Sequence, residues 1–136
     1  MDAAAMRRRL VEASVARLAT AGPDGRPHIV PIVFAHDDEN LYFVVDDKPK
    51  RSRDLKRVRN IAGNERVSVL VDHYEDDWTR LWWVRVDGVA HVIDHDVDAQ
   101  RALDLLAGKY AQYAEKRPQG PVVAIRIERM TGWSPA

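Results

Sequence analysis

Apolar and polar residues alternate along much of the chain, and this pattern predicts a protein built mainly of β-strands. Strands are expected at residues 15–20, 28–35, 41–45, 67–71, 81–93 and 122–127. Pro23 and Gly25 lie between the first two stretches, so residues 15–35 are predicted to form a hairpin. Pro31 cannot donate a ladder hydrogen bond, which predicts an edge, a bulge or a ligand-facing position. Asp87-Gly88 predicts a tight turn or a bulge within the fifth strand.

Helical spacing of apolar residues predicts three helices. The first covers residues 6–13, the second lies in a basic segment near residues 49–62, and the third covers residues 96–113, with Gly108 as a weak point. Pro49 and Ser52 suit the beginning of the second helix, and Gly63-Asn64 suits its end. The resulting order, α-β-β-β-α-β-β-α-β, favours an antiparallel sheet or barrel with flanking helices over a doubly wound parallel fold.

The composition indicates one globular domain over residues 1–136, with 46% hydrophobic and 31% charged residues. The chain has no cysteine, which fits a reducing compartment and excludes disulfides and thiolate metal sites. No apolar run reaches the length of a membrane span, and the N-terminus lacks the apolar region of a signal peptide. We therefore expect a cytoplasmic protein without a membrane partner.

Positive charge is concentrated in residues 48–59. This segment holds seven of the 21 Lys and Arg residues and one of the 21 acidic residues, although the whole chain has no net charge. Such a concentration predicts an anion-binding site, because a loop before a helix can add backbone N–H groups to the side-chain cations. A solvated helix face is the alternative. The neutral overall charge argues against a nucleic-acid partner.

Three tryptophans, Trp78, Trp82 and Trp83, lie within six positions. Neighbouring strand residues face opposite ways, so Trp82 and Trp83 cannot both point into one core. One of them is expected at a subunit interface or an aromatic ligand, with partial burial under a loop as the alternative. The five histidines show no metal-ligand spacing, and neither a nucleophile elbow nor a glycine-rich phosphate loop is present.

Several motifs together resemble the pyridoxamine-phosphate-oxidase-like split β-barrel family. They are Arg17-Leu18-Ala19-Thr20, the run from Asp24 to Ile32, Leu41-Tyr42-Phe43 with the basic segment, the run from Asn64 to Leu70, and Val84 to Gly88. The stretches from Asp46 to Lys50 and from Asp76 to Trp83 are similar to the branch assigned to deazaflavin (coenzyme F420) oxidoreductases.

The resemblance implies a six-stranded antiparallel split β-barrel of the FMN-binding type, mostly β with flanking helices. It also implies a homodimer with two cofactor sites at the dimer interface. In that family a strand lies along the tricyclic ring, and here it is the one containing Ile29, Val30, Pro31 and Ile32. In that family, basic residues at the exit of the third strand and in the helix after it hold the phosphate, and a partner subunit supplies an aromatic residue. The matching residues are Lys48, Lys50, Arg51, Ser52, Lys56 and Arg57 for the phosphate, and Trp78, Trp82 or Trp83 for the partner contact.

Coenzyme F420 is expected in preference to flavin mononucleotide (FMN), because seven local cations exceed the need of one phosphate and F420 adds a phosphodiester and a carboxylate tail. The implied activity is hydride transfer between the deazaflavin and a small conjugated or aromatic substrate. The residues identify no catalytic acid or base; Tyr42, His28 and solvent all remain open as proton donors. The alternatives are an FMN- or haem-binding protein of the same fold and a cofactor-binding module without turnover.

Overall fold

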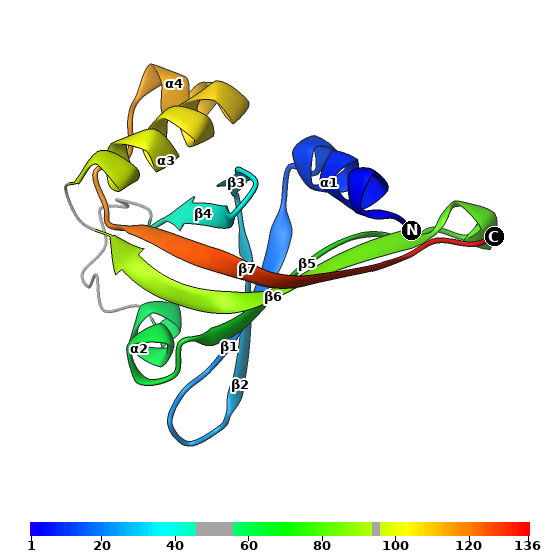
Figure 1. Ribbon diagram of the computed structural model, residues 1–136, viewed down its shortest axis with the longest axis horizontal. Helices are drawn as coiled ribbons and strands as arrows, with labels where there is room; N and C mark the ends of the chain where they lie inside the picture. The colour runs from blue at the N-terminus through cyan, green and yellow to red at the C-terminus, as the bar shows by residue number, and fades with distance from the viewer. Residues whose placement is uncertain (46–55, 94–95) are drawn as a thin grey trace.

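The computed structural model of the chain describes residues 1–45, 56–93 and 96–136. Its strands form one antiparallel sheet with the order β2-β1-β5-β6-β7-β4-β3 (Figure 1). The strands are β1 (Ala16–Ala21), β2 (Pro27–Ile32), β3 (Ala35–His36), β4 (Asn40–Val44), β5 (Arg66–His73), β6 (Trp82–Ile93) and β7 (Val122–Trp133). The helices are α1 (Ala3–Glu12), α2 (Lys56–Gly63), the short 3₁₀ turn η1 (Trp78–Arg80), α3 (Val97–Lys109) and α4 (Ala111–Glu115).

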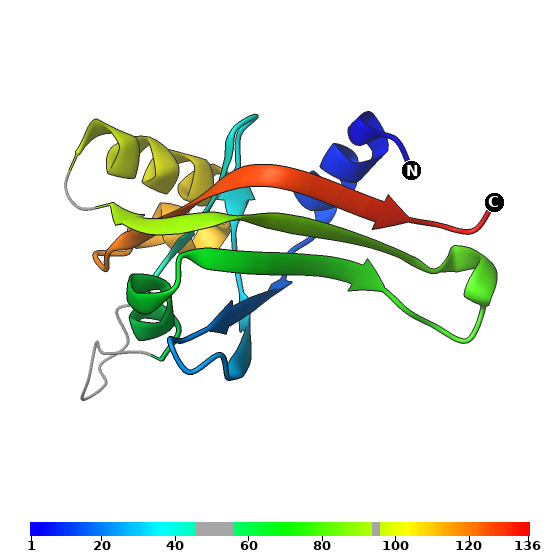
Figure 2. The same cartoon turned by 60° about the horizontal axis from the view of Figure 1, so that its bottom comes forward.

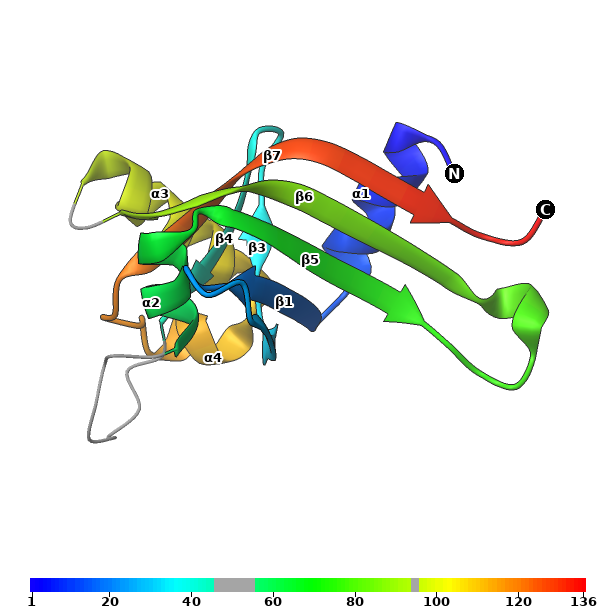
Figure 3. The same ribbon diagram turned by 90° about the horizontal axis from the view of Figure 1, so that it is seen from below.

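The sheet curls into a half-barrel, and the main core fills the inside of the curl. Figure 2 shows the long strands β5, β6 and β7 side by side, and Figure 3 shows α2 close to the beginning of β5. Leu18, Val69 and Val86 point inward and are fully buried. Met6 and Leu10 of α1 and Ile61 of α2 complete this core. The mostly β architecture with flanking helices, expected for a split β-barrel, is confirmed.

A second core lies between α3 and the opposite face of β3, β4 and the beginning of β7. Asp96 caps α3 by accepting a hydrogen bond from the Ala99 N–H at 2.8 Å. The helix ends at Lys109, where Tyr110 takes an extended conformation, and α4 follows. The single helix expected over residues 96–113 is therefore wrong in its last turn.

Tyr110 also explains why the sheet has seven strands where six were expected. Its hydroxyl accepts a hydrogen bond from the Phe34 N–H at 3.1 Å and lies 3.1 Å from the Phe34 carbonyl oxygen. The backbone of Phe34 is thus bonded to a side chain and not to a neighbouring strand. The expected strand over residues 28–35 divides at this point into β2 and the two-residue β3.

The Asp87-Gly88 pair is a bulge in one long strand, since the register between β6 and β7 shifts there. Gly88 packs so closely on the Arg126 carbonyl oxygen that a side chain at this position would collide with it. Strand β7 pairs with β6 as far as Trp133, six residues beyond the expected end at Ile127. The expectation failed because pairing with β6, and not local propensity, sets this boundary.

One face of the sheet remains open. The outward face of β2, β1, β5 and β6 is not covered by any helix of the described residues (Figure 1). Strand β2 forms one edge of the sheet, so Pro31 takes the edge position, one of the three that were expected for it. Among the described residues, the helices are all too short or too polar to cross a lipid bilayer.

Candidate functional site

Strand alternation aligns a row of side chains across the open face. Arg17 of β1 lies opposite Pro31 of β2 and Leu70 of β5. One step along the strand, Ala19 lies opposite Ile29 and Ser68. Their sequence neighbours point the other way into the core. Arg85 of β6 lies opposite Leu70, so the four strands present one continuous outward surface.

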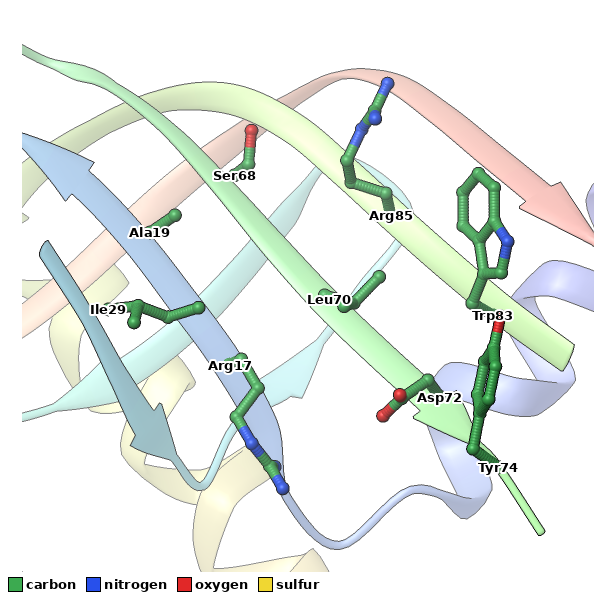
Figure 4. Close-up of a pocket in the computed structure, with 9 residues that line it drawn as sticks. All are labelled: Arg17, Ala19, Ile29, Ser68, Leu70, Asp72, Tyr74, Trp83 and Arg85. Carbon is green, nitrogen blue, oxygen red and sulfur yellow. The ribbon is translucent and has the colours of Figure 1, made fainter. Parts of the chain in front are cut away.

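This surface carries a pocket of about 500 Å³. Figure 4 shows its lining: side chains from β2, β1, β5 and β6, and Tyr74 just after β5. The lining residues are Arg17, Ala19, Ile29, Ser68, Leu70, Asp72, Tyr74, Trp83 and Arg85. Ile29, Leu70 and Trp83 make most of the exposed wall apolar, as in sites for flat ring compounds.

Two polar side chains of the pocket, Ser68 and Arg85, are already bonded to Asp87. The Ser68 hydroxyl donates to the Asp87 carboxylate at 2.6 Å, and the Arg85 guanidinium lies 3.2 Å from the other oxygen of Asp87. Arg17 and Asp72 are not bonded in this way. Among the described residues, neither side chain forms an ion pair or a hydrogen bond. The pocket thus offers one cation and one carboxylate to a ligand.

The strand expected along the cofactor ring contributes alternate residues to this surface. Ile29 lines the pocket with 66% of its surface exposed, and Pro31 points to the same side. Val30 packs against the core, and Ile32 is buried in it. Any contact that Val30 and Ile32 make with a ring would therefore use their backbone.

The three clustered tryptophans have different surroundings. Trp83 lines the pocket. Trp82 lies on the other face of β6, where the Arg9 guanidinium stacks over its ring at 4.5 Å. Trp78 is 76% exposed in η1 and is not part of the pocket lining. One copy of the chain thus brings, of these three tryptophans, Trp83 alone to this site.

The predicted phosphate ligands are only partly described. Lys48, Lys50, Arg51 and Ser52 lie outside the described residues. Lys56 is exposed and Arg57 is half-buried in the first turn of α2. Neither lines the pocket on the open face, so the phosphate site remains a prediction.

Helix α2 is fixed to the end of β1 by a buried polar pair. The Asn60 side-chain amide donates to the Thr20 hydroxyl at 3.0 Å, and both residues are less than 5% exposed. Gly22 lies against the Asn60 side chain, where a Cβ atom would come within 2.8 Å of its oxygen. Such a buried bond fixes the orientation of α2 and, with it, Lys56 and Arg57.

The two residues considered as proton donors lie away from the pocket. Tyr42 donates its hydroxyl hydrogen bond to Asp37 at 2.9 Å, and burial together with this bond raises the Tyr42 pKa above its ordinary value. His28 alternates with Ile29 and so points to the inner side of β2. Neither lines the pocket.

Sequence reasoning missed Arg17, Leu70, Asp72, Tyr74 and Arg85 as site residues. The signal was available in part, because Val67, Val69 and Val71 form the inward face of β5 and assign Ser68, Leu70 and Asp72 to the other face. Leu70 on a polar face is the anomaly that could have indicated a binding surface.

Part of the chain is similar in sequence to a reductase. A 57-residue stretch is 42% identical to 5a,11a-dehydrotetracycline/5a,11a-dehydrooxytetracycline reductase of Streptomyces rimosus subsp. rimosus. The match covers 41% of this chain and 38% of that protein, so the chain matches well under half of the relative's length.

Solved structures share the whole fold. A FAD-binding protein of Mesorhizobium loti is 25% identical with a TM-score of 0.71, over 97% of this chain and 93% of that one. The heme storage protein HutZ of Vibrio cholerae superposes with a TM-score of 0.74 at 15% identity, over 97% and 93% of the two chains. This second likeness concerns the fold alone.

A family model described as pyridoxamine 5'-phosphate oxidase matches residues 3–134, nearly the entire chain. The curled antiparallel sheet and its flanking helices agree with that match. The chain belongs to the pyridoxamine 5'-phosphate oxidase family.

Proposed function

We propose that this protein is an oxidoreductase that binds coenzyme F420 and transfers a hydride to a small conjugated or aromatic substrate. The observation that carries the proposal is the largely apolar pocket of about 500 Å³ on the open sheet face, with Trp83, Leu70 and Ile29 in its lining. Such a surface suits flat rings. The reductase name of the partial relative from Streptomyces rimosus supports redox chemistry.

The residues present fit a tricyclic ring with an anionic tail. Leu70 and Trp83 offer apolar and aromatic contact, and Ile29 lies on the strand that the resemblance assigns to the ring. Lys56 and Arg57, on a helix fixed by Asn60, would hold negative charge with the rest of the basic segment. The cofactor would supply the hydride; the protein would position the ring and exclude water from it.

Coenzyme F420 is proposed over FMN on electrostatic grounds. The segment 48–59 carries seven cations in a chain of zero net charge. A single phosphate needs two or three such partners, whereas a phosphodiester followed by several carboxylates would use more. FMN, which carries one phosphate, would use fewer of these cations and is the second candidate for the same pocket.

A homodimer is part of this proposal. The uncovered sheet face carries exposed Ile29 and half-buried Trp83, and a second copy would shield both from water. The pocket would then be enclosed between two copies. An aromatic side chain such as the exposed Trp78 of the second copy would supply the contact that one protomer lacks.

Haem binding at this pocket is a weaker alternative. Haem iron in proteins takes an axial ligand such as His, Cys, Met or Tyr. Of the described residues, the pocket lining includes Tyr74 but no histidine or methionine, and the chain has no cysteine. The fold shared with a heme storage protein therefore carries little weight for this site.

The test is a side-by-side titration of the purified protein with coenzyme F420 and FMN, followed by fluorescence polarisation. We expect F420 to bind with micromolar affinity or better, and binding to weaken as salt is raised. Arg57→Glu should weaken binding at least about tenfold, because it reverses a charge next to the proposed tail. Arg26→Glu, in the exposed turn between β1 and β2, is the matched control.

Tighter binding of FMN than of F420 would refute the choice of cofactor. A monomer at assay concentration in sedimentation velocity would refute the shared site. If reduced F420 binds but is oxidised by no compound in a panel of quinones, enones, nitroaromatics and conjugated rings that carry both an acidic group and a hydroxyl, the binding-module alternative replaces the enzyme proposal.

A further inference from the structure

The pocket on the open face has a charge arrangement that restricts what it can bind. Its apolar side chains lie beside two exposed charged residues, Arg17 and Asp72, for which the described part of the chain supplies no partner. A charged group beside apolar surface loses hydration when a flat ligand covers it, so the ligand must replace the lost hydrogen bonds. The two groups thus select among ring compounds.

Arg17 is the cation that this selection depends on. It lies near the beginning of β1, between Pro31 and Leu70, neither of which has a side chain that can accept a hydrogen bond. The other arginine of the pocket, Arg85, is already bonded to Asp87 at 3.2 Å. A guanidinium in this position presents a planar fork of N–H donors, which matches a carboxylate or an ionised enol oxygen.

Asp72 requires a hydrogen-bond donor on the ligand, whereas Arg17 requires an acceptor. It follows Leu70 by two residues on β5 and therefore points to the same face. Figure 4 shows its carboxylate turned toward the part of the pocket that the Arg17 guanidinium occupies. No ion pair joins the two among the described residues. An ionised carboxylate only accepts hydrogen bonds, so it requires an O–H or N–H group on the ligand.

We infer that the substrate lies beside the cofactor ring in this pocket and is a planar conjugated compound with two polar groups. One is an anionic oxygen that binds Arg17, and the other is a separate hydroxyl or N–H that binds Asp72. Hydroxylated aromatic acids and ring systems with an ionised enol have this chemistry. The inference rests on the proposed function and defines its substrate class. Neutral hydrocarbons and simple quinones lack one or both groups and would bind more weakly.

The test measures binding without any cofactor, so it stands apart from the F420 titration. The probes are 2-naphthoate, its neutral analogue 2-naphthamide, and the 5-, 6- and 7-hydroxy-2-naphthoates. Affinities are taken from calorimetry, and the indole N–H signal of Trp83 in NMR spectra reports whether the probe is in the pocket. We expect 2-naphthoate to bind at least about tenfold more tightly than 2-naphthamide, as for a charge-assisted hydrogen bond.

Two variants separate the two contacts. Arg17→Met should abolish the preference for the acid over the amide while keeping the apolar contact. At least one hydroxynaphthoate should bind more tightly than 2-naphthoate, and Asp72→Asn should remove that gain. Arg26→Met and Asp98→Asn, exposed changes away from the pocket, should alter neither ratio.

Equal affinities for acid and amide in the unmodified protein would overturn the inference, as would an unchanged ratio in Arg17→Met. The inference would also be overturned if Arg17→Met and Asp72→Asn each converted a dimer to monomers in sedimentation while their probe affinities equalled those of the unmodified protein. Arg17 would then pair with Asp72 of a second copy and not with a ligand. Circular dichroism of each variant confirms that the fold is retained.

Discussion

Trp82 and Trp83 are neighbours in β6 and lie on opposite faces of the sheet, one under the Arg9 guanidinium of α1 and the other in the open pocket. This arrangement divides two tasks between two identical side chains. Trp82 holds α1 against the core, where it packs beside buried residues. Trp83 is left available for a ligand or a second copy of the chain.

Alanine substitutions at these two positions should therefore have different effects. Trp82→Ala should lower the free energy of unfolding by about 1–3 kcal/mol, because it removes packing and the contact with Arg9. Trp83→Ala should change stability less and weaken F420 binding at least about tenfold. Urea unfolding and F420 titration of both variants check this. Similar losses of stability with unchanged binding would contradict the division.

Removal of the Asn60 amide should loosen α2. Asn60→Ala leaves the buried Thr20 hydroxyl without its 3.0 Å partner, at a cost of about 1–3 kcal/mol in unfolding free energy. Adding Thr20→Val should cost less than the sum of the two single changes, since the pair is removed together. Chemical denaturation of the four proteins gives this coupling energy. Strict additivity would mean that the bond contributes nothing.

Tyr110→Phe tests the side-chain bond that interrupts the second strand. The hydroxyl lies 2.9 Å from the Ser14 carbonyl oxygen and also bonds the backbone of Phe34. We expect a loss of about 1–3 kcal/mol, and faster hydrogen exchange at the Phe34 N–H. Tyr74→Phe, which loses an exposed hydroxyl, is the control. A loss no larger than in this control would refute the role of the bond.

Asp37 should make the protein sensitive to acid. Burial raises the pKa of its carboxyl, but hydrogen bonds outweigh burial and hold the pKa below its ordinary value. The donors are the N–H groups of Asn40 and Glu39 and the Tyr42 hydroxyl, and the positive charge of Arg101, 3.2 Å away, lowers the pKa further. Because the folded pKa is lower than the unfolded one, the stabilisation is complete above the unfolded value of about 3.9 and is lost as pH falls through the folded pKa.

The measurement is the free energy of unfolding from pH 6 down to pH 2 for the unmodified protein and Asp37→Asn. The variant should start lower and lose less stability with acid, so the two curves converge. Asp98→Asn, which changes an exposed carboxyl, should follow the unmodified protein throughout. Parallel curves for Asp37→Asn would show that Asp37 contributes nothing to the pH dependence.

The sequence predicted the fold where local pattern and tertiary structure agree. The first hairpin, with Gly25 at a φ of 76°, and the bulge at Asp87-Gly88 follow from turn chemistry. The boundaries at Tyr110 and Trp133 did not follow. The first depends on a bond to Phe34, 76 residues away, and the second on pairing with β6. Such long-range contacts leave no local signal.

The candidate site could be predicted in outline only. Ile29 and Trp83 were identified because a family resemblance and an aromatic cluster drew attention to them. Arg17 and Asp72 looked like ordinary solvent-facing strand residues, since alternation shows which face a side chain is on and not what covers that face. Only the sheet order shows that no described helix covers this one.

The two prolines of β2 have a consequence for the protein at high concentration. Pro27, Ile29 and Pro31 alternate along β2, the strand at the edge of the sheet. Neither proline carries a backbone N–H, so of these three residues only Ile29 can donate a hydrogen bond to an incoming strand. Chain-to-chain growth of fibres along this border is therefore disfavoured. Replacing both prolines with valine should make the protein more prone to form fibres at high concentration than the unmodified chain.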